Sequence, residues 1–119
     1  MATAVKRKLS GSTDGMGIKV VATATAGTLI HTAVAGTTAG TFDEIWLWAF
    51  NSHSADLILT IEFGDATAPD HNIVTTVTFK TGLHLIVPGM ILQNGLTVKA
   101  FASSANLITI TGFVNSITD

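Results

Sequence analysis

Apolar and polar residues alternate along most of the chain, which is typical of strands that cover a core with one face. In the heaviest segment, FDEIWLWAFN (42–51), Ile45, Leu47 and Ala49 point to one side and the aromatic residues to the other. A strand that is apolar on both faces is central in a sheet, or a partner covers its second face. Further predicted strand segments are 18–25, 28–34, 56–63, 72–80, 82–89, 90–95, 96–102 and 106–114.

Turn-forming residues separate these segments roughly every 10 residues. Pro88-Gly89 predicts a turn, and Asn94-Gly95 is the favoured pair of a tight hairpin turn. Helical periodicity persists in no window. The sequence therefore predicts an all-β fold: a single β-sandwich, jelly-roll-like, with eight or nine short antiparallel strands.

The N-terminal segment, residues 1–15, is small, polar and weakly patterned. It predicts an extended or mobile arm, followed by a β-sandwich domain over residues 16–119. A frayed terminus and an arm that reaches a neighbouring subunit explain this segment equally well. It contains no apolar stretch of the kind found in secretory signals.

Composition points to contact with other protein. Charged residues make up 12% of the chain, against about 25% in a typical soluble domain. The mean hydropathy is +0.51, yet no apolar run approaches the roughly 18 residues of a membrane helix. A surface buried against other chains would explain both values, and an uncharged, threonine-rich outer face is the alternative.

Charge and cysteine content exclude several function classes. The six basic residues are too few for a nucleic-acid surface, and three of them stand together as Lys6, Arg7 and Lys8. The absence of cysteine excludes disulfides and thiolate metal sites. We therefore expect no nucleic-acid partner and no membrane partner.

The stretch GDATAPDHN (64–72) is the most suggestive of chemistry, because it holds Asp65, Asp70 and His71. Aspartate and asparagine also favour turns, since their side chains bond nearby backbone N–H groups. The pattern of a calcium-binding helix–loop–helix is absent, and the four histidines show no paired spacing. The stretch is therefore interpreted as a strand connection, with no metal and no cofactor.

In a second polar stretch, NSHSAD (51–56), Ser52, His53 and Ser54 are adjacent and Asp56 follows. Adjacent side chains on a turn diverge, so they do not form a nucleophile, base and orienting group. No nucleophile elbow, phosphate-binding loop or dinucleotide fingerprint occurs in the chain. We expect a hairpin loop here and no enzymatic activity.

Trp46 and Trp48 lie on the same face of the predicted strand 42–51. Exposed tryptophans on a β-sandwich can stack on sugar rings, but large aromatic side chains more often fill a core or a subunit interface. We favour burial. The predicted subunit-interface residues are Trp46, Trp48, Phe50 and Phe101.

From about Gly17 onward, the chain resembles a group of small structural proteins of tailed bacteriophages. The resemblance rests on the phrases GIKVVATATAGTLIHTAVAGTTAGTFDEIWLWAFN, LTIEFGDATAPD, LIVPGMILQNGLTVKAFA and ITGFVN. Such proteins are commonly capsid decoration, or cement, proteins that form trimers between major capsid subunits and stiffen the shell. The resemblance carries over no catalytic residue and no contact motif.

The resemblance implies a homotrimer that binds the major capsid protein on the outer surface of the virion, after synthesis in the host cytoplasm. Lys6, Arg7 and Lys8 are the residues predicted to contact an acidic capsid surface. Two alternatives stay open: another virion component, such as a tail or head–tail protein, and a carbohydrate-binding β-sandwich for host attachment.

Overall fold

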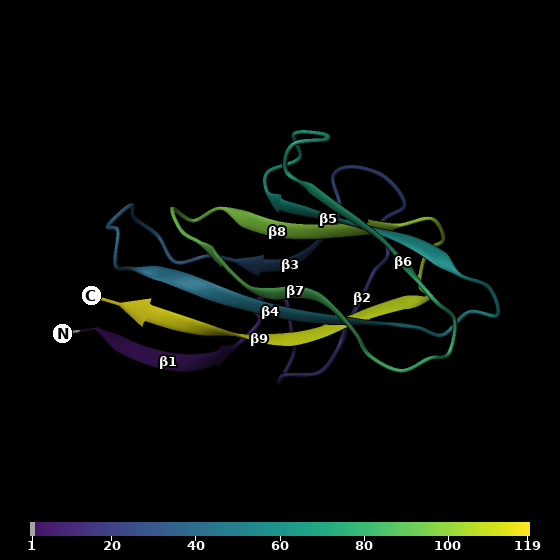
Figure 1. The fold of residues 1–119 in the computed structure, drawn as a ribbon, viewed down its shortest axis with the longest axis horizontal. Coiled ribbons are helices and arrows are strands. Elements are labelled where there is room, and N and C mark those ends of the chain that lie inside the picture. Colours follow the sequence, from purple (N-terminus) through teal and green to yellow (C-terminus); the bar gives the residue numbers. More distant parts are fainter. Residues whose placement is uncertain (1) are drawn as a thin grey trace.

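The computed structural model describes residues 2–119, which form nine β-strands and no helix (Figure 1). The molecule is elongated, with extents of 48 × 27 × 21 Å. No helix in the described residues is long and apolar enough to cross a membrane. The strands are β1 (Thr3–Lys8), β2 (Ile18–Lys19), β3 (Thr28–Thr32), β4 (Phe42–Asn51), β5 (Leu57–Gly64), β6 (Asn72–Val77), β7 (His84–Leu92), β8 (Thr97–Ala102) and β9 (Ile108–Thr118).

The strands form two antiparallel sheets that pack face to face. Sheet A has the order β1-β9-β4-β7, and β2 pairs with β9 on the same edge as β1. Sheet B has the order β3-β8-β5-β6. When β1 and β2 are counted as two parts of one edge strand, this is the strand order of a jelly roll, with two interlocked Greek keys. The prediction of a single, jelly-roll-like β-sandwich is confirmed.

The core lies between the two sheets and follows the predicted alternation. Along β4 every second residue is buried, so Ile45, Leu47 and Ala49 face sheet B while Trp46 and Trp48 face away from it. Burying one such aliphatic side chain stabilises the fold by roughly 1.5–3 kcal/mol. The buried apolar residues are Leu9, Ile18, Val20, Ile30, Ile45, Leu47, Ala49, Leu57, Leu59, Ile61, Val77, Val87, Val98, Ala100, Ala102, Ile108, Ile110 and Val114.

The N-terminal segment is part of the sandwich. Residues 3–8, assigned to an arm from the sequence, form β1 and pair with β9 from Thr3↔Thr118 to Lys8↔Phe113. All six side chains of β1 are exposed, but Leu9 directly after them is only 1% exposed. The backbone ladder and the burial of Leu9 thus attach residues 3–9 to the sandwich.

Two turn predictions need correction. Pro88-Gly89 does not end a strand, because β7 runs through it along the edge of sheet A, where proline has no ladder hydrogen bond to lose. The register of β7 against β4 shifts between Ile45 and Trp46, and Gly89 absorbs the irregularity with a φ of 75°. Asn94 and Gly95 both have positive φ, as predicted, but they connect sheet A to sheet B instead of closing a hairpin.

Candidate functional site

The loop 64–72 connects β5 to β6, and its polar side chains mostly bond within it. The Asp65 carboxylate accepts a hydrogen bond from the Thr67 backbone N–H at 2.9 Å and contacts His71 Nδ1 at 2.5 Å. The backbone N–H of His71 donates to the Thr67 carbonyl at 3.0 Å. In residues 2–119 no three or more histidine, aspartate or glutamate side chains group in a way that could hold a metal ion. These hydrogen bonds join residues of the loop to one another, as in a turn that connects two strands.

The Asp65–His71 pair predicts a titration that can be measured. The hydrogen bond from His71 is the largest of the contacts that lower the pKa of Asp65 to about 2, and the same bond raises the pKa of His71. The pair therefore stabilises the loop fully between pH 3.8 and 6.5, the ordinary pKa values of the two groups. Its contribution is lost as the pH rises through the raised pKa of His71, or falls toward about 2.

We expect Asp65→Asn to return the pKa of His71 toward its ordinary value, as followed by NMR titration of the imidazole protons. Asp56→Asn, which changes an exposed carboxylate in the β4–β5 turn, is the control and leaves His71 unchanged. An unaltered His71 titration in Asp65→Asn would show that the ion pair does not form in solution.

The stretch 51–56 connects β4 to β5, as a loop was predicted to do. It does not close a hairpin, because β4 belongs to sheet A and β5 to sheet B. Asn51 is fully buried and organises this turn, with its amide nitrogen donating to the carbonyls of Ala55 and Val77 at 3.1 and 2.8 Å. The Asn51 side-chain oxygen accepts from the His53 backbone N–H at 2.8 Å. The polar side chains here hold the backbone, and no nucleophile–base contact forms among them.

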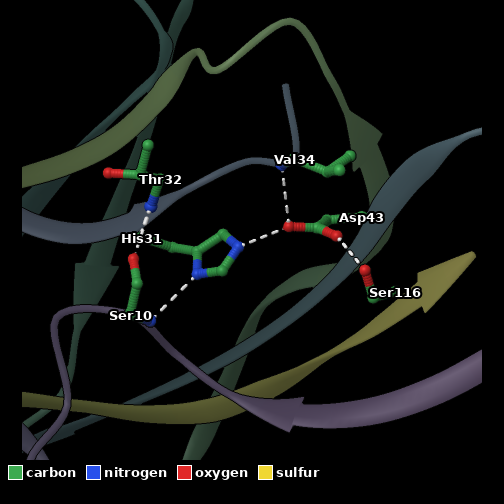
Figure 2. Close-up of polar contacts among 6 residues, drawn as sticks. All are labelled: Ser10, His31, Thr32, Val34, Asp43 and Ser116. Atoms are coloured by element: carbon green, nitrogen blue, oxygen red, sulfur yellow. Dashed lines mark hydrogen bonds and ion pairs between the residues drawn. The ribbon is translucent and has the colours of Figure 1, made fainter. Parts of the chain in front are cut away.

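A buried polar network that the sequence analysis missed joins β3, β4 and β9 (Figure 2). His31 and Asp43 are each only 4% exposed, and His31 Nε2 lies 2.7 Å from Asp43 Oδ2. His31 Nδ1 accepts a hydrogen bond from the Ser10 backbone N–H at 3.0 Å. Because Nδ1 accepts, the imidazole is neutral and its proton sits on Nε2, where it donates to Asp43.

The Asp43 carboxylate is surrounded by donors. Besides His31, the Val34 backbone N–H donates to Oδ2 at 3.2 Å, and the Ser116 hydroxyl donates to Oδ1 at 2.8 Å (Figure 2). The Ser10 hydroxyl oxygen also accepts a hydrogen bond from the Thr32 backbone N–H at 2.7 Å. Both imidazole nitrogens are engaged, so His31 has no free lone pair to act as a base in this arrangement. The network fastens the end of β1 to both sheets.

The residues predicted for a subunit interface lie on two opposite faces of the sandwich. Trp46, Trp48 and Phe50 lie on the outer face of sheet A, the face turned away from the core. Phe101 lies on the outer face of sheet B, because its neighbours Ala100 and Ala102 face the core. One flat contact cannot therefore include all four residues.

The residues predicted for capsid contact divide between two places on β1. The Lys6 ammonium lies 4.4 Å from the centroid of the Phe113 ring on the outer face of sheet A. Arg7 and Lys8 both line a cleft of about 490 Å³ beside the His31–Asp43 network, and the Lys8 ammonium donates to the Ser12 carbonyl at 3.1 Å. The three cations belong to an edge strand of sheet A.

Three aromatic rings gather on the outer face of sheet A, and we call Trp46, Trp48 and Phe113 the aromatic plate. Their ring centroids lie 6.0–6.4 Å apart in all three pairs, with interplanar angles of 18–28°. Three rings in a column would have one centroid distance twice the other two, so these rings form a compact cluster in which each ring packs on the other two. All three side chains are half-buried.

Polar side chains border the plate on one side. The Trp46 indole N–H donates to Glu44 Oε1 at 2.7 Å, and the Asn115 side-chain amide donates to the same oxygen at 3.1 Å. Both hydrogen bonds lower the pKa of Glu44, and the one from Trp46 has the larger effect. The carboxylate therefore stays ionised beside the rings over a wide pH range.

The sequence analysis found the two tryptophans but missed their partners. Alternation along 106–114 places Phe113 on an outward-facing side, which is a usable signal, but its contact with Trp46 depends on the pairing of β4 with β9. Comparisons with protein-family models, with curated proteins and with solved structures found no match. The function is therefore argued from the residues of this chain.

Proposed function

We propose that the chain is a structural protein of a bacteriophage particle. It decorates the outer surface of the capsid between major capsid subunits, assembles there with copies of itself as a trimer, and stiffens the shell. The low content of charged residues, 12%, supports an assembly role, as do the sequence phrases described above. Jelly rolls also build viral capsid domains, which is support at the level of the fold alone.

One observation carries the proposal, a set of exposed apolar side chains on β6, on β7 and in the segment between them. Six of the twelve large apolar side chains that are exposed in residues 2–119 fall between residues 74 and 91. We call these six the apolar edge. They are Val74 (63% exposed), Phe79 (46%), Leu83 (60%), Leu85 (50%), Met90 (39%) and Ile91 (57%). Exposed apolar residues concentrated in this way mark a site of protein contact.

The apolar edge can contact a partner through its side chains, but β7 is poorly suited to pair with a further strand. β7 is the edge strand of sheet A, but Pro88 lacks an N–H and two register shifts interrupt the strand. Proline and bulges are the usual means of blocking pairing between edge strands. A partner would therefore pack on Leu83, Leu85 and Ile91 without extending the sheet.

The doubly substituted variant Leu83→Lys/Leu85→Lys tests this assignment. Both side chains are at least half exposed, so we expect the fold to tolerate lysine there while two charges enter the contact. Light scattering coupled to size exclusion should give a native mass near three times 12.3 kDa for the unaltered protein and near 12.3 kDa for the variant. Thr23→Lys, in an exposed loop, is the control and should keep the mass of the unaltered protein.

Two results would contradict the proposal. The first is an unaltered protein that is monomeric at the highest concentration tested. The second is an oligomer that persists in Leu83→Lys/Leu85→Lys, because the apolar edge would then not be the contact.

A further inference from the structure

The aromatic plate sits directly beside a row of polar side chains, as the strand register shows. Lys6, Asn115 and Glu44 lie opposite one another across β1, β9 and β4, on the outer face of sheet A. The next row along the same face holds Phe113 opposite Trp46. One face of this sheet thus carries a polar strip and an aromatic strip in contact with each other.

Trp46 lies against β7 at Gly89, which has no side chain. A Cβ added to Gly89 would lie 2.8 Å from Trp46 Cζ2 and 3.0 Å from Cε2. Glycine thus makes room for the indole against the neighbouring strand, as aromatic side chains do when they cover glycines in sheets. The core and sheet B lie on the other side of sheet A, so the three side chains of the plate leave the sheet on its outer face.

The polar strip keeps hydrogen-bonding capacity after its internal contacts are made. Glu44 Oε1 accepts both internal hydrogen bonds, which leaves Oε2 available. Asn115 uses its amide nitrogen, which leaves its carbonyl oxygen as an acceptor. The Lys6 ammonium, over the Phe113 ring, supplies donors at the other end of the strip.

We propose that this face binds neutral pyranose rings of a glycan, with the aromatic plate under the sugar and the polar strip along its edge. A pyranose has an apolar face of C–H groups and a rim of hydroxyls, so it matches an aromatic surface bordered by acceptors and donors. Ligand sites combine apolar and aromatic lining with a few placed polar groups in this way.

This inference goes beyond the proposed capsid role, because it assigns a ligand to the aromatic plate. Leu85 and Ile91 of the apolar edge adjoin the plate and the polar strip, since they pair with Trp48 and Glu44. The plate is a surface and not a cavity, so each sugar would be covered on one side only. Binding of a single sugar is then weak, and several copies on one particle would raise the apparent affinity for a multivalent glycan.

Tryptophan fluorescence tests the proposal directly, because the chain has two tryptophans and both belong to the plate. The full chain is titrated with glucose, galactose, mannose and N-acetylglucosamine, and then with a panel of oligosaccharides. We expect a saturable change in emission with at least one of them. Trp48→Ala should weaken binding at least tenfold, with Trp46 still reporting, and Asn115→Ala should weaken it by about two- to tenfold.

Phe101→Ala is the matched control, since it removes a half-buried aromatic side chain from the opposite face. It should leave sugar binding unchanged. The proposal is overturned if no sugar or oligosaccharide changes the emission, or if Trp48→Ala and Asn115→Ala both bind like the unaltered protein. Emission that acrylamide cannot quench in the assembled protein would also overturn it, and would assign the plate to a subunit contact. The native mass is unaffected by these outcomes, so failure here is distinguishable from failure of the capsid proposal.

Discussion

Asp43→Ala is expected to lower the free energy of unfolding by roughly 3–5 kcal/mol, a large part of the about 5–15 kcal/mol that holds a domain of this size. The carboxylate accepts hydrogen bonds from His31, Val34 and Ser116. Alanine leaves these donors without an acceptor at a position that is only 4% exposed. A buried donor that is left without an acceptor costs more free energy than its hydrogen bond had contributed to stability.

Urea denaturation of Asp43→Ala, followed by circular dichroism, measures this loss. Asp43→Asn keeps the shape and one acceptor oxygen, so it should lose less. Asp70→Ala removes an exposed carboxylate and serves as the control, with a change within about 0.5 kcal/mol. If Asp43→Ala were as stable as the control, the network in Figure 2 would not bear on folding.

Gly112→Ala should prevent β9 from pairing with β4 in the observed register. A Cβ at this position would lie 2.0 Å from the Trp46 carbonyl oxygen and 3.2 Å from Leu47 Cα. Both neighbours are backbone in the centre of sheet A, so neither can turn away as a flexible side chain would. We expect little soluble folded protein. The free energy of unfolding should fall by as much as it does for severe substitutions in a protein core.

Soluble yield and thermal unfolding of Gly112→Ala provide the measurement. Gly40→Ala is the control, because its Cβ would meet only the side chain of Asp119 near the chain end. Normal yield and an unchanged melting temperature for Gly112→Ala would mean that the β4–β9 register differs from the one described. The aromatic plate would then be in doubt as well, since the same register places Phe113 opposite Trp46.

Local pattern was sufficient for the sandwich because each core strand carries its own alternation. In β4 the three residues predicted to share one face, Ile45, Leu47 and Ala49, are all completely buried. Pro88-Gly89 was interpreted wrongly because the dipeptide also fits an irregular edge strand, and edge position is a property of the sheet. β1 was missed because its side chains are all exposed, and its order comes from the backbone ladder with β9.

The candidate site was only partly predictable for a related reason. Trp46 and Trp48 share one strand, so their common face follows from the sequence. Phe113 and Asn115 join them only through the pairing of β4 with β9, strands far apart in the chain. The same holds for His31 and Asp43, because a histidine at an inward position says nothing about which acid it meets across the sandwich.

Co-sedimentation with capsids shows whether the chain is a decoration protein, as proposed. Capsids of a phage that encodes such a chain are prepared without it, mixed with increasing amounts of the purified protein and pelleted. We expect saturable binding in a fixed ratio to the major capsid protein, with binding reduced in Leu83→Lys/Leu85→Lys and kept in Thr23→Lys. A chain that stays in the supernatant at every concentration would contradict it.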